Sequence, residues 1–287
     1  MTGPRYKVTV NERTHMVAEC ATGRWLGACG ANFYRPWVFP LYTPRGLTVV
    51  REFPFDHPFH NGVFVGQQPV LVAGRTGNLW AAPPARSFDD KLSKDVGRVD
   101  LPQGQPEVDI AADGVRFTFR GVWRDEQEQP VIDEVRTVTF RAVEDATICD
   151  VTSEKIATYG PAEYPRTKFG AVGARVETRL LPPLGGVVLA DAGRRGGAEV
   201  VHEGESDFVA YENDLPATGR LGLLMHILDE GVRGPWFIRD YGMAMYNPTW
   251  AGPVLSGRGQ SWTVSLRVVA YDGAATEERA RTWLNVH

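Results

Sequence analysis

Two of the six histidines of this chain, His57 and His60, lie three residues apart in a proline-rich segment, residues 34–66. Asp56 precedes the first histidine and Asn61 follows the second. Imidazoles beside a carboxylate are the usual material of metal sites and acid–base sites. Two chemistries therefore fit this spacing: both histidines bind one divalent metal ion, or they form a metal-free acid–base pair in which Asp56 tunes His57. The alternative is a solvated turn in which Asp56 and Asn61 cap backbone groups.

A second polar group interrupts the apolar segment 235–248, where Arg239, Asp240 and Tyr241 are consecutive. If the segment is a strand, Arg239 and Tyr241 share one face and Asp240 lies on the other. Buried charges need partners. Arg239 and Asp240 therefore belong either to an ion pair between strands, or to a cavity that Asp240 and Tyr241 share with the histidines.

Charged residues also occur between glycines and prolines in the segment 159–175. Glu163 is a candidate third metal ligand or general base there. Lys168 and Arg175 suit a carboxylate or a sugar hydroxyl. Solvation at the surface is the alternative for each of these charges. In contrast, His226 lies inside an apolar run, which is typical of a core histidine.

Alternation of apolar and polar residues predicts the elements that hold these groups. Period-two alternation and β-branched residues indicate strands. The clearest segments are 6–10, 115–123, 135–143, 147–153 and 261–271. Consecutive strands at short spacing predict one large antiparallel β-sandwich that comprises all residues 1–287.

Helix is expected mainly at the C-terminal end, over residues 275–284, with Thr276 as N-cap and acidic residues in the first turn. A weaker helix candidate is Ser87–Lys94. That candidate lies in a polar stretch, residues 83–104, which we interpret as a long loop. Because long loops in compact domains are often lids, we predict that residues 91–104 form a mobile flap over the site.

The composition excludes several classes of function. The chain has 287 residues, of which 43% are hydrophobic and 23% charged, and a formal net charge of -4. Neither the charge nor the dispersed arginines predict a nucleic-acid partner. No apolar run approaches a membrane span, and no apolar segment of a signal peptide is present, so we expect a cytoplasmic protein. Phosphate-loop and strand-linked GxGxxG patterns are absent, so no nucleotide cofactor is expected.

The three cysteines, Cys20, Cys29 and Cys149, form no CxxC pattern. An odd count without close pairing argues against a disulfide framework. We therefore expect free thiols, as in a reducing compartment, and no thiolate zinc site.

Three separated stretches resemble a bacterial family of unknown function that is often labelled "methane oxygenase PmoA". They are RPWVFPLYTPRGLTVVREFPFDHPFHNGVFVG, TKFGAVGARV and PWFIRDYGMAMYNP. The resemblance implies a galactose-mutarotase-like β-sandwich, or supersandwich. The matching motif residues are Asp56, His57, His60, Lys168, Arg239, Asp240, Tyr241 and Asn247. This sequence departs from the family pattern at Asn61–Phe64 and at Val38–Pro40, where relatives carry other residues.

The resemblance and the polar clusters together predict a carbohydrate-active enzyme, a lyase or hydrolase that acts on a keto sugar or glycoside. We expect His57, His60, Asp240 and Tyr241 to be catalytic. If a divalent metal is present, His57, His60 and Glu163 are its expected ligands, and Asp240 is the alternative third ligand. Expected substrate-binding residues are Arg35, Trp37, Asn61, Lys168, Arg239 and Asn247, with Trp250 as a further stacking surface.

A non-catalytic carbohydrate-binding or partner subunit is the rival interpretation, since it would use the same aromatic residues without a metal or a base. The expected partner is a small sugar-like ligand in either case. The sequence leaves open whether the protein is a homo-oligomer.

Overall fold

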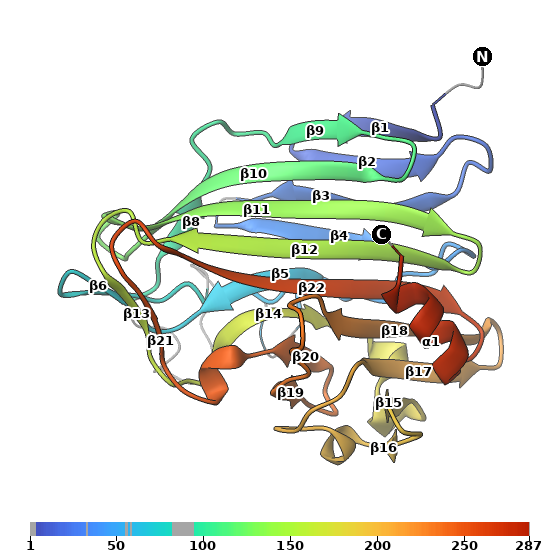
Figure 1. The fold of residues 1–287 in the computed structure, drawn as a ribbon. Helices are drawn as coiled ribbons and strands as arrows, with labels where there is room; N and C mark the ends of the chain where they lie inside the picture. The colour runs from blue at the N-terminus through green and yellow to red at the C-terminus, as the bar shows by residue number, and fades with distance from the viewer. Residues whose placement is uncertain (1–3, 33, 55–56, 58, 82–94, 287) are drawn as a thin grey trace.

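The computed structural model describes residues 4–32, 34–54, 57, 59–81 and 95–286. Antiparallel strands dominate these residues, and one short α-helix, α1 (Glu277–Leu284), lies at the C-terminal end of the chain (Figure 1). The predicted all-β class with a C-terminal helix is thereby confirmed. Thr276 is the N-cap of α1, as predicted, because its side chain accepts a hydrogen bond from the Arg279 amide.

The strands of the described residues form three sheets. The first has eight strands in the order β1 (Tyr6–Asn11), β2 (Thr14–Glu19), β3 (Trp25–Ala31), β4 (Pro36–Leu41), β5 (Val63–Gln67), β14 (Gly170–Arg175), β20 (Met243–Tyr246) and β19 (Trp236–Ile238). A small four-stranded sheet has the order β21 (Val254–Ser256), β13 (Ala162–Tyr164), β6 (Val70–Val72) and β7 (Arg75–Gly77).

The largest sheet has ten described strands and contains the longest ones. Its order is β16 (Arg195–Gly196), β15 (Val187–Ala190), β17 (Val209–Leu215), β18 (Gly219–Ile227), β22 (Ser261–Asp272), β12 (Ala146–Ile156), β11 (Pro130–Val143), β10 (Val115–Arg124) and β8 (Arg98–Asp100), with β9 (Glu107–Ile110) paired to β10. Four of the five sequence-predicted strands, at 115–123, 135–143, 147–153 and 261–271, lie in this sheet, and the fifth is β1.

One apolar core joins the two larger sheets. Phe117, Trp123 and Phe140 contribute from the ten-stranded sheet, and Val65 and Val172 contribute from the eight-stranded sheet. Period-two alternation buries every second residue of β10, and from β11 it places Ile132, Val138, Phe140 and Ala142 in this core. Because burying apolar area is the main favourable term in folding, this alternation is what fixes the register of the long strands.

Short 3-10 helices connect the strands on one side of the core. They are η2 (Thr178–Leu180), η3 (Pro182–Leu184), η4 (Ala198–Val200) and η5 (Pro248–Trp250). Among the described residues, no helix is long and apolar enough to cross a membrane.

Two local predictions differ from the structure. Residues 239–242 are not strand: β19 ends at Ile238, and a tight turn follows in which the Gly242 amide donates to the Arg239 carbonyl oxygen. Within the predicted flap, Arg98–Asp100 form strand β8 and pair with β10, so this part belongs to the sheet. The rest of the flap up to residue 94, and the helix candidate Ser87–Lys94, lie outside the described residues.

Candidate functional site

The two polar stretches of the sequence meet because of the strand order around β14. Both β5 and β20 pair antiparallel to β14, so they run parallel to each other. The segment before β5, which carries the histidines, and the turn before β20, which carries Tyr241, therefore lie at the same end of the sheet. Arg175, the last residue of β14, ends there too.

The histidine segment is pinned to this sheet at Gly62. The Gly62 amide donates to the Arg51 carbonyl oxygen, and its own carbonyl accepts from the Arg175 amide at 2.8 Å. Gly62 has a φ of 56°, and a Cβ there would lie 1.8 Å from the Val38 carbonyl oxygen. Only glycine fits this approach, so the sequence at 62 fixes where the preceding turn sits. Within that turn, the His60 amide donates to the His57 carbonyl oxygen at 3.0 Å.

Four rings stack in a column at this end of the sheet. The ring centroids of Phe64 and His60 are 4.6 Å apart, those of His60 and His57 are 5.4 Å apart, and those of His57 and Tyr241 are 6.2 Å apart. All three pairs are close to parallel, with interplanar angles of 17°, 13° and 2°. The Arg175 guanidinium lies over the Tyr241 ring at 4.9 Å, which is a cation–π contact.

His60 is the buried centre of this column. Its side chain is fully buried, with the Phe59 and Trp80 rings edge-on to it at 4.5 and 4.3 Å. Neither of its ring nitrogens has a hydrogen-bond partner among the described residues. Burial holds the pKa of His60 well below its ordinary value, and the nearby His57, Arg35 and Arg175 lower it further. His60 is therefore a neutral imidazole near pH 7.

The column opens to solvent at its other end. His57 is half-buried, and the Tyr241 side chain is 42% exposed. An exposed aromatic face next to buried imidazoles suits a small amphipathic ligand. Sequence reasoning predicted His57, His60 and Tyr241, and the structure brings these three together.

Asp240, the other predicted catalytic residue of the turn, does not join the column. It is exposed, and its carboxylate accepts a hydrogen bond of 2.7 Å from the Ala198 amide at the start of η4. The carboxylate thus ties the turn to η4.

Glu163 is also separate from the histidines. It lies on the exposed side of β13 in the four-stranded sheet, where it pairs with Leu71 and Leu255. The described part of the chain contains no group of three His, Cys, Asp or Glu residues that could hold a metal ion. The structure therefore does not bring Glu163 together with His57 and His60, because a strand of another sheet carries this carboxylate. Asp56 lies outside the described residues.

Two of the predicted substrate-binding residues are used internally. Arg35 is buried and donates to the carbonyl oxygens of Trp80 and Ala81. Burial, aided by the nearby Arg136, lowers the pKa of Arg35 to about 9. Asn247 is fully buried, donates to the Thr167 carbonyl oxygen and accepts from the Thr249 hydroxyl. Their donors hold the backbone around the site.

The remaining predicted ligand residues are spread around the site. Asn61 accepts a hydrogen bond of 2.6 Å from the Phe53 amide, so it caps the turn. Lys168 is exposed, with its ammonium over the Phe169 ring at 5.2 Å. The Arg239 guanidinium lies over the Phe237 ring at 4.7 Å. Trp37 is half-buried on β4, where it pairs with Gly30.

Several site residues were not predicted from the sequence. Phe64 and Trp80 belong to a small apolar cluster with Phe59, Phe237 and Met245 that surrounds His60. The sequence gives only a weak indication of Phe64 and Trp80 as site residues, since isolated aromatic residues occur throughout the chain. Arg175, in contrast, was named from its segment as a group that suits a carboxylate or a sugar hydroxyl, and the structure places its guanidinium over the Tyr241 ring.

Comparison with family models assigns most of the chain. A model of a family of unknown function, DUF6807, matches residues 27–285. The chain belongs to this family. The resemblance noted in the sequence had likewise implied a family of unknown function, but no comparison supports the label "methane oxygenase PmoA". A search of curated proteins found no match.

Several solved structures are similar to this chain in fold. One is a mutant heparan sulfate lyase from Pedobacter heparinus, with 10% sequence identity and a TM-score of 0.38. The match covers 94% of this chain and 37% of the lyase. A galactose mutarotase-like protein from Lactobacillus casei has 7% identity, a TM-score of 0.39, and coverage of 93% and 100%. A 4-alpha-glucanotransferase from Thermococcus litoralis has 12% identity, a TM-score of 0.36, and coverage of 93% and 40%. This chain thus spans well under half of the lyase and the glucanotransferase. All three TM-scores are below 0.5.

Proposed function

We propose that this DUF6807 protein is a carbohydrate-active enzyme, a lyase or hydrolase that acts on a keto sugar or keto glycoside. The observation that carries the proposal is His60, a fully buried imidazole whose two ring nitrogens have no hydrogen-bond partner in the described residues. A buried unpaired polar group costs about 1–3 kcal/mol. A ligand that pairs with His60 accounts for this cost.

The roles follow from the two environments of the histidines. His60 is held neutral by its depressed pKa, so it is a poor base but a good hydrogen-bond donor to a carbonyl oxygen. His57 is half-buried and lies between His60 and Tyr241, where it can take a proton from the carbon next to that carbonyl. The Tyr241 ring is 42% exposed and can contact the sugar, and the Arg175 guanidinium over the same ring adds positive charge.

A divalent metal remains a prediction. His57 and His60 could supply two nitrogen donors, but the described residues provide no third protein ligand. A zinc site normally has three or four protein ligands. The described donor set does not fit such an ion, and the roles given to the two histidines require none.

Turnover of defined probes tests the proposal. Methyl glucoside and methyl galactoside, each with and without oxidation of one ring hydroxyl to a ketone, are incubated with the protein, and their consumption is followed by NMR. We expect consumption of at least one keto form. General acid–base groups contribute about 10²–10⁴-fold, so His57→Ala should slow the reaction at least about 100-fold.

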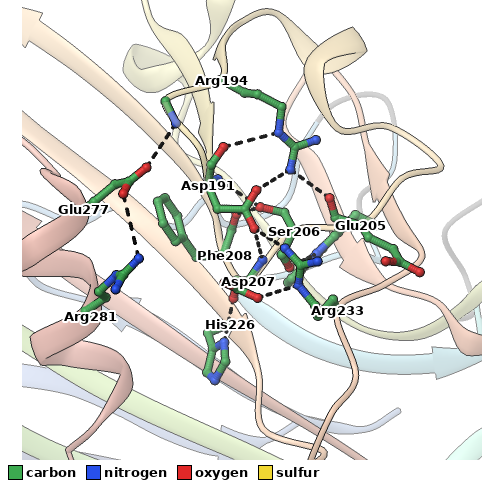
Figure 2. Close-up of polar contacts among 12 residues, drawn as sticks. Asp191, Arg194, Glu205, Ser206, Asp207, Phe208, His226, Arg233, Glu277 and Arg281 are labelled. Carbon is green, nitrogen blue, oxygen red and sulfur yellow. Dashed lines mark hydrogen bonds and ion pairs between the residues drawn. The ribbon is translucent and has the colours of Figure 1, made fainter.

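His226 provides a matched control. Its Nδ1 lies 2.6 Å from the Asp207 carbonyl oxygen, so it is a satisfied histidine (Figure 2). The turnover rate of His226→Gln should stay within about twofold of the wild-type rate, because substitutions away from the site have small effects. Retained binding by saturation-transfer NMR without turnover would favour the non-catalytic carbohydrate-binding alternative. If the wild-type protein neither binds nor turns over any of the probes, the proposal is overturned.

A further inference from the structure

A second set of buried polar residues lies inside the sandwich, between the long strands. Glu134 and Arg136 come from β11, and Ser153 and Lys155 come from β12. All four side chains occupy inward positions of the alternation, and all are buried. The strand register places Glu134 opposite Lys155, and Lys155 opposite Trp262 of β22.

Glu134 is fully satisfied within this set. It accepts hydrogen bonds from the indole of Trp123 at 2.7 Å, from the hydroxyl of Ser153 at 2.5 Å and from Arg136 at 2.9 Å. The remaining end of the Arg136 guanidinium donates to the Pro36 carbonyl oxygen at 2.8 Å. This carboxylate and this guanidinium are therefore committed to structure.

Lys155 and Tyr164 are not satisfied. The amine of Lys155 and the hydroxyl of Tyr164 are buried, and neither has a hydrogen-bond partner in the part of the chain that the structure describes. Both flank Trp262: the Lys155 amine is 4.5 Å from its ring centroid, and the Tyr164 ring centroid is 4.4 Å from it. The Trp123 ring lies on another side of Lys155, at 5.7 Å.

The surroundings favour the neutral amine. Burial lowers the pKa of Lys155 to about 7, although the nearby Glu134 raises it and Arg136 lowers it. Asp229, the other charged group that acts on Lys155, also raises its pKa. Burial raises the pKa of the Tyr164 hydroxyl, which therefore stays protonated. With a pKa of about 7, a large share of the Lys155 amine is uncharged near neutral pH, and an uncharged amine is a nucleophile.

We propose that Lys155 and Tyr164 form a second ligand site, in which the Lys155 amine reacts with the carbonyl carbon of a small aldehyde or ketone. This site does not include the histidine column. Its indole walls suit an uncharged ligand. Glu134 repels anions, and the donors of Arg136 are already used, so a phosphate or carboxylate ligand does not fit.

The covalent step balances without a co-reactant. The nitrogen lone pair of Lys155 forms a bond to the carbonyl carbon, and the carbonyl oxygen takes up a proton to give a carbinolamine. Loss of that oxygen as water, with the protons of the amine, leaves an imine. In the proposed step the Tyr164 hydroxyl, the other unpaired buried group next to Trp262, donates and recovers the proton at oxygen. Of the residues in this set, only Trp262 is partly exposed, so access is from its side.

Reductive labelling of the wild-type protein tests the site. The folded protein is treated with propanal and cyanoborohydride at pH 7, and peptide mass mapping quantifies each lysine. At this pH about half of an amine with a pKa near 7 is neutral, against less than about 0.1% of an ordinary lysine. Burial of Lys155 restricts the access of the reagents and so reduces its advantage in rate. We therefore expect Lys155 to be labelled at least about tenfold faster than the exposed Lys168 and Lys7.

Two further measurements separate reactivity from chance modification. Lys155 labelling should rise with pH and level off above about pH 8. Tyr164→Phe should slow Lys155 at least about threefold without changing Lys168, since only proton transfer is removed. The proposal is overturned if Lys155 reacts no faster than Lys168 in the folded protein, or if its pH profile parallels that of Lys168.

Discussion

Two polar regions of this protein contrast in how completely their groups are paired. In the Asp191 network, shown in Figure 2, one carboxylate oxygen of Asp191 binds Arg194, and the other binds Arg233 and the Asp207 amide. In the buried set around Lys155, and at His60, buried nitrogens have no partner among the described residues. Both regions carry charged groups, but of the two only the region around Lys155 and His60 has buried side-chain atoms without a partner among the described residues.

The difference separates structural polarity from functional polarity. The Asp191 network ties the loops that carry Asp191, Asp207 and Arg233 together near the surface, and it needs no ligand to do so (Figure 2). Unpaired buried groups instead lower stability, and they are retained where a ligand or a reaction uses them. Stability measurements on both regions therefore test the functional assignments.

The largest effect is expected for Glu134→Ala. Removing this carboxylate leaves the buried Arg136 guanidinium without its ion-pair partner, so the free energy of unfolding should fall by about 3–5 kcal/mol. Urea denaturation monitored by tryptophan fluorescence measures it. Glu107→Ala is the control: its ion pair with Arg120 is exposed and should contribute about 1 kcal/mol or less. Equal effects of the two variants would show that the buried set is not interdependent.

Lys155→Met should stabilise the protein, by about 2 kcal/mol at pH 6, because it replaces an unpaired buried amine with an apolar chain. The folded pKa, about 7, lies below the ordinary value of 10.5, so the unfolded chain binds more protons between these limits. Wild-type stability therefore rises with pH through this window, and the advantage of the variant should shrink toward pH 9. Urea denaturation at both pH values measures this change. A constant advantage would contradict the depressed pKa, and Lys168→Met should show neither effect.

His60→Phe should also stabilise the fold, by about 1 kcal/mol, since an unpaired imidazole is replaced by an apolar ring among aromatic neighbours. The wild-type protein should lose stability as the pH falls below the ordinary histidine pKa of 6.5, because His60 takes up a proton only when unfolded. The variant should lack this part of the acid sensitivity. Thermal unfolding at pH 7.5 and 5.5 measures both the gain in stability and its dependence on pH. His226→Phe should instead destabilise, and a loss of stability in His60→Phe would indicate a structural histidine.

The smallest effect is expected for Asp191→Asn, a loss of about 1 kcal/mol at low salt, because its arginine partners are partly exposed. Burial would raise the pKa of Asp191, but its hydrogen bonds with Asp207, Arg194 and Arg233 lower it to about 2. Its contribution is thus present above the unfolded pKa and lost as the pH falls from about 4 to 2. Urea denaturation should show the deficit shrinking in 1 M salt. An effect above about 3 kcal/mol would contradict this assignment.

Alternation along the chain was sufficient to predict the long strands, the all-β class and the N-cap of the C-terminal helix. These features are local: side-chain period and capping depend on neighbours within a few residues. The polar stretches around His57, His60 and Tyr241 were likewise visible, because such groups interrupt apolar runs. What their side chains contact was not visible.

Only the tertiary structure decided which of these groups meet. The order β5, β14, β20 brings His57, Tyr241 and Arg175 to one end of a sheet, whereas Glu163 is carried away on β13 and Asp240 is turned toward η4. No sequence signal singled out Lys155, which the strand register places opposite Glu134 and Trp262. Strand pairing depends on burial between residues far apart in sequence, so period-two alternation alone determines which side of a strand is buried but not what that side contacts.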